Sequence, residues 1–163
     1  MKTEKLFMMQ KELDSHIQSL HGLAGEDLFD RKVLALLVEA GELANETRCF
    51  KFWSMKPSSE KTIILEEFVD GIHFILSLGI EAGFDGIKEI TNEVPAGMDA
   101  SSQFLEVYAA IQRFRSSRSK EDYQHLFKHY LELAEILGLK DSEIEQAYIE
   151  KNEVNYDRQK NGY

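Results

Sequence analysis

The sequence predicts an all-α protein, a helical bundle of about six to seven helices in a single domain over residues 1–163. Apolar residues recur at spacings of three and four over long stretches, which is the period of an amphipathic helix. Only two prolines and ten glycines interrupt the chain, so long helices and short turns are expected. No stretch alternates apolar and polar residues for long, which argues against a sheet.

The first three helices follow one another with short breaks. Residues 3–21 carry one apolar stripe and form an amphipathic helix. Residues 27–51 are apolar on more than one side, which predicts a helix enclosed by its neighbours. Residues 62–81, with Ser58 or Ser59 as the N-cap, are apolar nearly all round, so this helix should be central to the fold.

The second half of the chain begins with a segment rich in turn residues. Residues 84–100 are expected to be a connection with one short helix around Ile87. The three helices predicted after it span residues 101–116, residues 119–137 with Ser119 as the N-cap, and a last segment that opens with a Ser142–Glu145 capping box and runs through Val154 before a polar tail over 157–163.

Charge and cysteine content exclude several classes of protein. The chain holds 19 basic and 29 acidic side chains, a net charge of −10, and its basic residues form no cluster, so nucleic acid is not an expected partner. A single cysteine, Cys49, excludes an internal disulfide framework and fits a reducing compartment, the cytoplasm. The most apolar segment, residues 72–80, is too short to cross a membrane, and residues 1–11 do not resemble a signal peptide.

Two pairs of acidic residues lie in otherwise apolar helices. Glu39 and Glu42 are three residues apart in one helix, and Glu67 and Asp70 are three apart in the next, so each pair projects from one helix face. A hairpin of these helices can bring all four carboxylates together in the interior, where they need basic partners or metal ions. The alternative is that both pairs lie on solvated faces or next to basic residues.

Four oxygen ligands without imidazole or thiolate suit Mg²⁺, with Mn²⁺ as a substitute. The chemistry that such a site supports is metal-assisted attack of water on a phosphoanhydride, with the four carboxylates as the catalytic and metal-binding set. A di-iron carboxylate bundle competes with this interpretation, but it needs Glu-x-x-His pairs in two helices. Only Asp70 with His73 approaches that pattern, so the di-iron site is less favoured.

Two further segments could bind a nucleotide. Lys151, Asn155 and Arg158 share one face of the last helix, where they could bind phosphates or simply form a solvated surface. An aromatic and basic cluster over residues 50–53 follows the second helix and offers Trp53 for stacking on a base and Lys51 for a phosphate. In this cluster, Phe50 and Phe52 could equally be core aromatics.

Together these motifs resemble the all-α dimeric dUTP diphosphatases, within the wider MazG-like nucleoside triphosphate pyrophosphatases. The motifs that carry the resemblance are Glu39-x-x-Glu42, Glu67-x-x-Asp70, Cys49-Phe50-Lys51-Phe52-Trp53-Ser54, His73-Phe74-x-Leu76-Ser77 and Lys151-x-x-x-Asn155-x-x-Arg158-x-x-x-Gly162-Tyr163. They span nearly the whole chain. The resemblance implies a homodimer that hydrolyses dUTP, and also dUDP in some members, to dUMP with Mg²⁺ held by the four carboxylates.

The resemblance also implies roles for individual residues. Those at the nucleotide are Trp53 and Phe74 beside the uracil, Lys51 and His73 lining the nucleotide site, Lys151, Asn155 and Arg158 on the phosphates, and Gln10 and Asp14 in base recognition. Two alternatives stay open, a related pyrophosphatase that prefers another base such as that of dCTP, and a helical dimer that binds a regulatory protein. Residues 84–100 and the two helices after them match no functional motif and are expected to pack the dimer.

Overall fold

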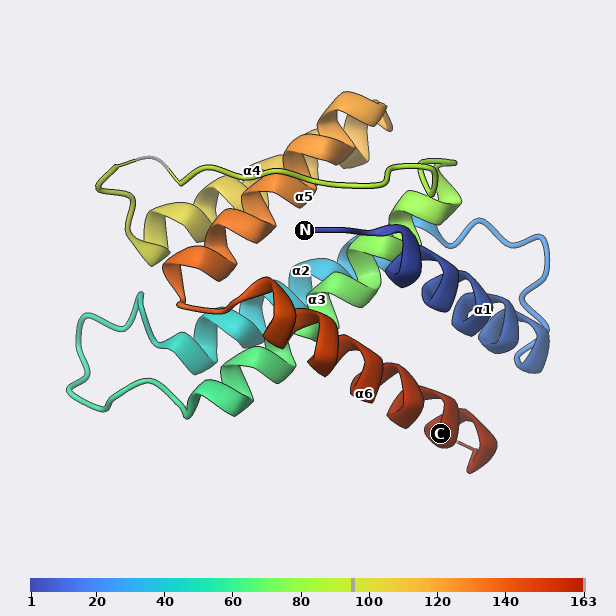
Figure 1. Ribbon diagram of the computed structural model, residues 1–163, viewed down its shortest axis with the longest axis horizontal. Coiled ribbons are helices and arrows are strands. Elements are labelled where there is room, and N and C mark those ends of the chain that lie inside the picture. The colour runs from blue at the N-terminus through green and yellow to red at the C-terminus, as the bar shows by residue number, and fades with distance from the viewer. Residues whose placement is uncertain (95, 163) are drawn as a thin grey trace.

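The computed structural model describes residues 1–94 and 96–162 and is built from α-helices (Figure 1). Its helices are α1 (Glu4–Leu20), α2 (Phe29–Thr47), α3 (Lys61–Glu81), α4 (Ala100–Ser117), α5 (Lys120–Ile136) and α6 (Asp141–Lys160). Within the described residues the one β-type pairing is an isolated antiparallel bridge between Lys2 and Glu89. The predicted all-α class and helix number are therefore confirmed.

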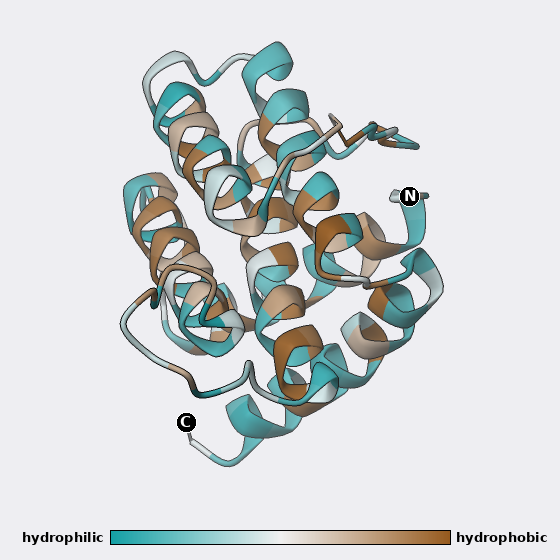
Figure 2. Cartoon of the chain, turned by 90° about the vertical axis from the view of Figure 1, so that its left-hand side faces the viewer, coloured by the Kyte–Doolittle hydropathy of each residue, from teal (hydrophilic) through white to brown (hydrophobic). Residues whose placement is uncertain are grey.

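Helix α3 lies at the centre of the bundle, as its composition predicts. It packs against α1, α2, α5 and α6, and side chains such as Phe68, Val69 and Ile72 are fully buried. Helices α2 and α3 form one hairpin, joined by the loop over residues 48–60, and α4 and α5 form a second one (Figure 1). The apolar sides of the helices face one another and the polar sides face outwards, so the hydrophobic effect holds the hairpins together (Figure 2).

Helix α6 brings the end of the chain back onto its beginning. It packs along α1 and α3, so residues far apart in sequence meet there (Figure 1). The connection after α3 runs back past the N-terminus, where the backbone N–H of Thr3 donates to the Lys88 carbonyl at 3.0 Å and that of Ile90 to the Met1 carbonyl at 3.0 Å. These contacts fix the start of α1 against the bundle.

Two tyrosines of α5 fit into glycine positions of α3. The Tyr130 hydroxyl donates to the Phe68 carbonyl at 3.0 Å, and a Cβ added at Gly71 would lie 2.0 Å from that hydroxyl. About two turns further along α3, the Tyr123 hydroxyl donates to the Ile75 carbonyl at 3.1 Å beside Gly79. Because only glycine leaves room for these rings, Gly71 determines how closely α5 approaches α3 next to Asp70.

Several predicted helix boundaries and one predicted environment are wrong. Helix α2 ends at Thr47, where Arg48 adopts a left-handed conformation with φ 58°, and not at residue 51. It is also not enclosed, because Leu34 is 63% exposed and Val38 is 49% exposed. The described residues around Ile87 contain no helix. The polar tail is mostly helical, since α6 continues to residue 160.

The predicted capping residues are partly right. Ser119 caps α5, since its side chain accepts from the backbone N–H of Asp122 at 3.1 Å. At α6 the Glu143 carboxylate instead accepts from the backbone N–H of Lys140 at 2.9 Å, so the box predicted from Ser142 is displaced by two residues. Helix α3 begins after Glu60, and neither predicted serine caps it, because Ser59 donates its hydroxyl proton to Glu46.

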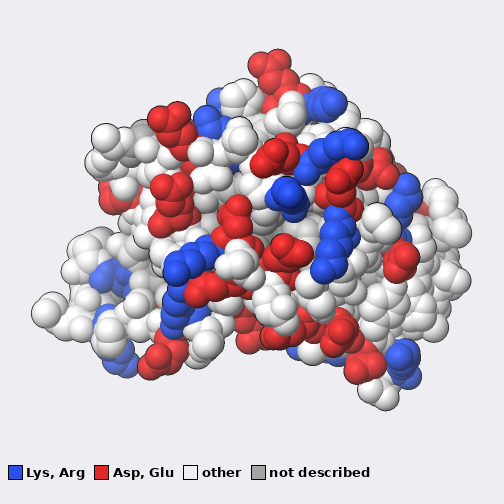
Figure 3. All heavy atoms as spheres, viewed as in Figure 1, with Lys and Arg blue, Asp and Glu red and all other residues white. Residues whose placement is uncertain are grey.

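Charged side chains are interspersed on the face of the molecule that Figure 3 shows. Lysines and arginines lie next to aspartates and glutamates on this face. The ion pairs of the structure include Lys61 with Glu143 at 2.8 Å and Lys151 with Glu66 at 2.9 Å. None of the helices in the described part of the chain has the length and apolar character needed to cross a membrane.

Candidate active site

Three carboxylates from the α2–α3 hairpin meet at the middle of the bundle. Glu39, Glu67 and Asp70 each offer an oxygen, and these oxygens lie within 4.8 Å of one another. The hairpin brings them together because Glu39 on α2 lies opposite the Glu67–Asp70 turn of α3. Glu42, the fourth predicted member, is exposed and lies outside this set, close enough to influence the charges of Glu39 and Glu67.

Burial and mutual repulsion raise the pKa values of these carboxylates. Burial, and after it the charges of Asp70, Glu42 and Glu67, raise the pKa of Glu39 to about 7. Burial and the neighbouring carboxylates also raise the pKa of Glu67, and burial raises that of Asp70. All three side chains are half-buried, so the predicted placement in the interior is wrong. This partial burial still disfavours three negative charges at this distance.

The cations at the cluster among the described residues include Lys151 of α6, and Arg158 of the same helix also lowers the pKa of Asp70. The ammonium group of Lys151 donates to Asp70 Oδ2 at 2.8 Å and to Glu66 Oε1 at 2.9 Å, with only 11% of its side chain exposed. A single lysine cannot balance three carboxylates. Oxygen ligands from three carboxylates at this spacing suit a divalent cation such as Mg²⁺ or Mn²⁺, so the residues present fit the predicted metal.

A cavity of about 250 Å³ lies beside the acidic cluster, between α1, α3 and α6. It brings together many of the residues that the sequence singles out. Its lining consists of Gln10, Leu13, Asp14, Ile17, Glu39, Asp70, His73, Phe74, Ser77, Asn155, Arg158 and Gln159. The cavity therefore has carboxylates at one end, polar groups and aromatic rings along α1 and α3, and amide and guanidinium groups from α6.

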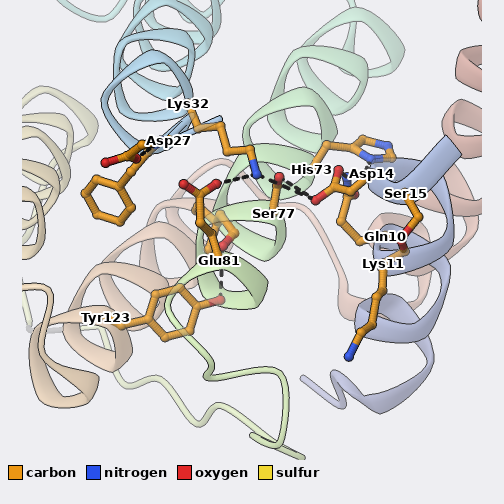
Figure 4. Close-up of polar contacts among 12 residues, drawn as sticks. Gln10, Lys11, Asp14, Ser15, Asp27, Lys32, His73, Ser77, Glu81 and Tyr123 are labelled. Atoms are coloured by element: carbon orange, nitrogen blue, oxygen red, sulfur yellow. Dashed lines mark hydrogen bonds and ion pairs between the residues drawn. The ribbon is translucent and has the colours of Figure 1, made fainter. Parts of the chain in front are cut away.

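A chain of polar contacts supports the α1 side of the cavity (Figure 4). Gln10 Nε2 donates to Asp14 Oδ1 at 2.8 Å, and Ser77 Oγ donates to Asp14 Oδ2 at 2.6 Å. The ammonium group of Lys32 lies 4.0 Å from Asp14 Oδ2 and forms an ion pair with Glu81. Burial still raises the pKa of Asp14 above its ordinary value, because these partners offset only part of the loss of hydration.

The same chain continues to α6 through a buried histidine. Gln10 Oε1 lies 2.8 Å from His73 Nδ1 and accepts a hydrogen bond from the Tyr148 hydroxyl at 2.8 Å. The imidazole of His73 stacks on the Tyr148 ring, with centroids 4.2 Å apart. Burial lowers the pKa of His73 to about 3, so its ring is neutral at physiological pH.

The loop after α2 lies away from this cavity. Lys51 and Trp53 are absent from the cavity lining, and Trp53 is 66% exposed, with its ring edge-on to Phe50 and Phe52. The alternative that Phe52 is a core aromatic is wrong, because 94% of it is exposed. Lys51 donates to the side chain of Asn45. Of the C-terminal motif, Tyr163 lies outside the described residues.

Several residues of the site carry no predicted role, among them Ser77, Lys32 and Tyr148. Ser77 follows His73 by one helical turn, and that spacing could have indicated a shared face. Lys32 and Tyr148 reach the site from α2 and α6, and no local pattern in the sequence connects them with Asp14 or Gln10. Their contribution depends on helix packing.

Clustered carboxylates on a helical hairpin, next to a cavity with polar and basic groups, define the class of all-α nucleotide pyrophosphohydrolases. A family model described as dUTPase matches residues 2–163, so the chain belongs to the all-α dUTPase family. The enzyme hydrolyses dUTP to dUMP and pyrophosphate. Members of the family generally use a divalent metal and are generally oligomeric. No curated protein matches the chain.

Proposed function

We propose that dUTP hydrolysis depends on Mg²⁺ held by Glu39, Glu67 and Asp70, with Glu42 completing the set from the exposed edge of α2. The observation that carries this proposal is the approach of three carboxylate oxygens to within 4.8 Å of one another, beside Lys151. When bound, Mg²⁺, or Mn²⁺ in its place, supplies charge neutralisation for the polyphosphate and a lowered pKa for water.

The phosphates of dUTP are proposed to bind between the acidic cluster and α6. Asn155 and Arg158 line the cavity from α6, and Arg158 is close enough to lower the pKa of Asp70 and Glu66. Lys151 shares this helix and is held at Asp70 by a 2.8 Å contact. These groups can donate to phosphate oxygens, and Arg158 can do so with two N–H groups at once.

The uracil is proposed to bind at the other end of the cavity. Phe74 offers a ring face there, and Gln10, Asp14 and His73 supply the polar groups that recognise a base. Lys51 and Trp53 stay predicted nucleotide contacts, carried by the exposed loop after α2. Replacing Trp53 by alanine tests that role, since it should raise the KM for dUTP while leaving the helical content unchanged.

The decisive experiment is a substrate panel with and without divalent metal. We expect pyrophosphate release from dUTP in Mg²⁺, slower release from dCTP and dTTP, and none after EDTA treatment. Including dUDP shows whether the diphosphate is also cleaved. Full activity in EDTA, restored by no added ion, would contradict the metal site. Activity on dCTP equal to that on dUTP would contradict the assigned base pocket.

We further propose that the enzyme is a homodimer that forms through the exposed apolar side of α2 and α4. Leu34 and Val38, one turn apart on α2, are 63% and 49% exposed, and Leu105 on the adjacent α4 is 71% exposed. A second copy would remove these side chains from water. Light scattering should give twice the chain mass for the wild type and one chain mass for Leu34→Lys with Leu105→Lys.

The remaining proposals concern organisation and setting. We treat residues 1–163 as one domain and place the enzyme in the cytoplasm, where nucleotide pools are used. A regulatory protein partner stays a prediction to which we assign no surface. A pull-down with the wild type and with the Leu34→Lys, Leu105→Lys variant tests whether such a partner uses the same apolar face.

A further inference from the structure

The Gln10 amide at the base end of the cavity is buried and held from both ends. Its side chain is 3% exposed, Nε2 donates to Asp14 at 2.8 Å, and Oε1 faces both His73 Nδ1 and the Tyr148 hydroxyl at 2.8 Å. An amide can be turned over with little change in shape, so these partners decide which of its two polar atoms points where.

Asp14 and Tyr148 hold the Gln10 amide from its two ends, and Asp14 acts at the Nε2 end. Its carboxylate can only accept, so Gln10 must direct Nε2 towards it. Ser77 and Lys32 face the other carboxylate oxygen and favour the ionised form (Figure 4). With Oε1 then directed at the opposite side, both of its partners there must donate to it.

The orientation of the Gln10 amide determines which nitrogen of His73 carries the proton. A neutral imidazole carries one N–H, so His73 must carry it on Nδ1, where it donates to Gln10. His73 Nε2 is then an acceptor, and in the structure it is buried and has no hydrogen-bond partner. The buried hydroxyl of Tyr148 supplies the second donor to Gln10 Oε1, since it has one proton and its oxygen lies closer to Oε1, at 2.8 Å, than to the Leu6 carbonyl, at 3.3 Å.

We propose that Tyr148 is a positioning residue for base selection, which rests on the proposed placement of uracil at Gln10. By donating to Oε1 it keeps the amide turned so that the second hydrogen of Nε2 is available to the base. Uracil presents a carbonyl acceptor at its 4-position, where cytosine presents an amino donor. A fixed N–H on the protein therefore accepts uracil and rejects cytosine, because two donors cannot bond to each other.

The variant Tyr148→Phe tests this inference, because it removes the hydroxyl and keeps the ring that stacks on His73. We expect the ratio of kcat/KM for dUTP to that for dCTP to fall about tenfold, since the Oε1 end of the amide then loses one of its two donors and Asp14 alone holds Nε2 in place. The matched control is Tyr123→Phe, which removes a buried hydroxyl bonded to the Ile75 carbonyl away from the cavity and should leave the ratio unchanged. A ratio for Tyr148→Phe within twofold of the wild type overturns the proposal.

A second measurement does not depend on catalysis. Nitrogen NMR of the nucleotide-free enzyme should show the His73 proton on Nδ1 in the wild type and a mixture of tautomers in Tyr148→Phe. Should the wild type fail to cleave dUTP, the proposed function is wrong, and the tautomer alone decides this inference: a proton on Nε2 overturns it. If Tyr148→Phe does not fold, Ser77→Ala loosens Asp14 from the other end and should lower the same ratio.

Discussion

Two neighbouring stretches of α3 differ in how far their polar groups are paired. At Glu67 and Asp70, three carboxylate oxygens lie within 4.8 Å of one another, and one lysine ammonium group faces them. One turn further along, at His73 and Ser77, both oxygens of Asp14 accept hydrogen bonds, and Gln10 is engaged through both of its polar atoms.

The difference shows how one helix can serve two tasks. The carboxylates repel one another, and the divalent cation that we propose for this site would relieve the repulsion, so this stretch is suited to exchange of ions and phosphates. A satisfied and buried hydrogen-bond chain is rigid, which suits recognition of a base by fixed donors and acceptors. The experiments below separate these two kinds of site.

The largest effect is expected from Glu39→Gln. Loss of one carboxylate from the proposed metal site should lower kcat for dUTP by about 10³-fold, which corresponds to about 4 kcal/mol in the barrier. Thermal stability should stay the same or rise, because a like charge is removed. Steady-state kinetics and a melting curve measure both, with Glu106→Gln, an exposed acid on α4, as the control. A clear loss of stability would show that Glu39 has a structural role.

Gly71 lies on α3 between the two stretches, and Gly71→Ala tests how far stability depends on the close approach of α5 there. The added Cβ would lie 2.0 Å from the Tyr130 hydroxyl, so α5 must move away from α3. We expect the free energy of unfolding to fall by about 2 kcal/mol, measured with urea. Gly86→Ala, where no atom lies within 4 Å of the new Cβ, is the matched control. Equal stability of the two variants would mean that the tyrosine ring relocates without cost.

Ser77→Ala should have an effect on stability opposite in sign to that of Glu39→Gln. It removes the 2.6 Å donor to the buried Asp14 carboxylate, so the free energy of unfolding should fall by about 1–2 kcal/mol. Ser15→Ala on α1, where the hydroxyl is exposed, serves as the control in the same urea experiment. If Ser77→Ala is as stable as the control, the polar chain does not hold Asp14.

At neutral pH the smallest effect is expected from His73, because its contribution to stability changes only as the pH falls. Burial lowers its pKa to about 3 in the folded protein, whereas an unfolded histidine titrates near 6.5. Below about pH 6.5 the unfolded chain therefore binds more protons, and stability is lost as the pH falls, by about 1.4 kcal/mol per unit for this one group. Comparing urea unfolding of the wild type and His73→Gln from pH 7 to pH 5 isolates this slope. Equal slopes would place a charged imidazole in the folded protein.

Much of the fold could be predicted because it follows from local periodicity. The central place of α3 follows from a segment that is apolar nearly all round, and the Ser119 cap follows from hydrogen bonding within four residues. The errors arise where periodicity is ambiguous. Apolar residues on two sides of α2 resemble enclosure, but Leu34 and Val38 remain exposed, and an apolar residue such as Ile87 can be buried without a helix.

What the sequence determined by itself is the pairing of acidic residues on two successive helices, since spacing within a helix fixes which side chains share a face. The tertiary structure decided which of them meet: Glu39 joins Glu67 and Asp70, while Glu42 stays at the edge. It also decided that Lys151 faces the cluster. The contact of Lys151 with Asp70 joins residues 81 positions apart, and contacts of this kind depend on how whole helices pack, which no short stretch of sequence encodes.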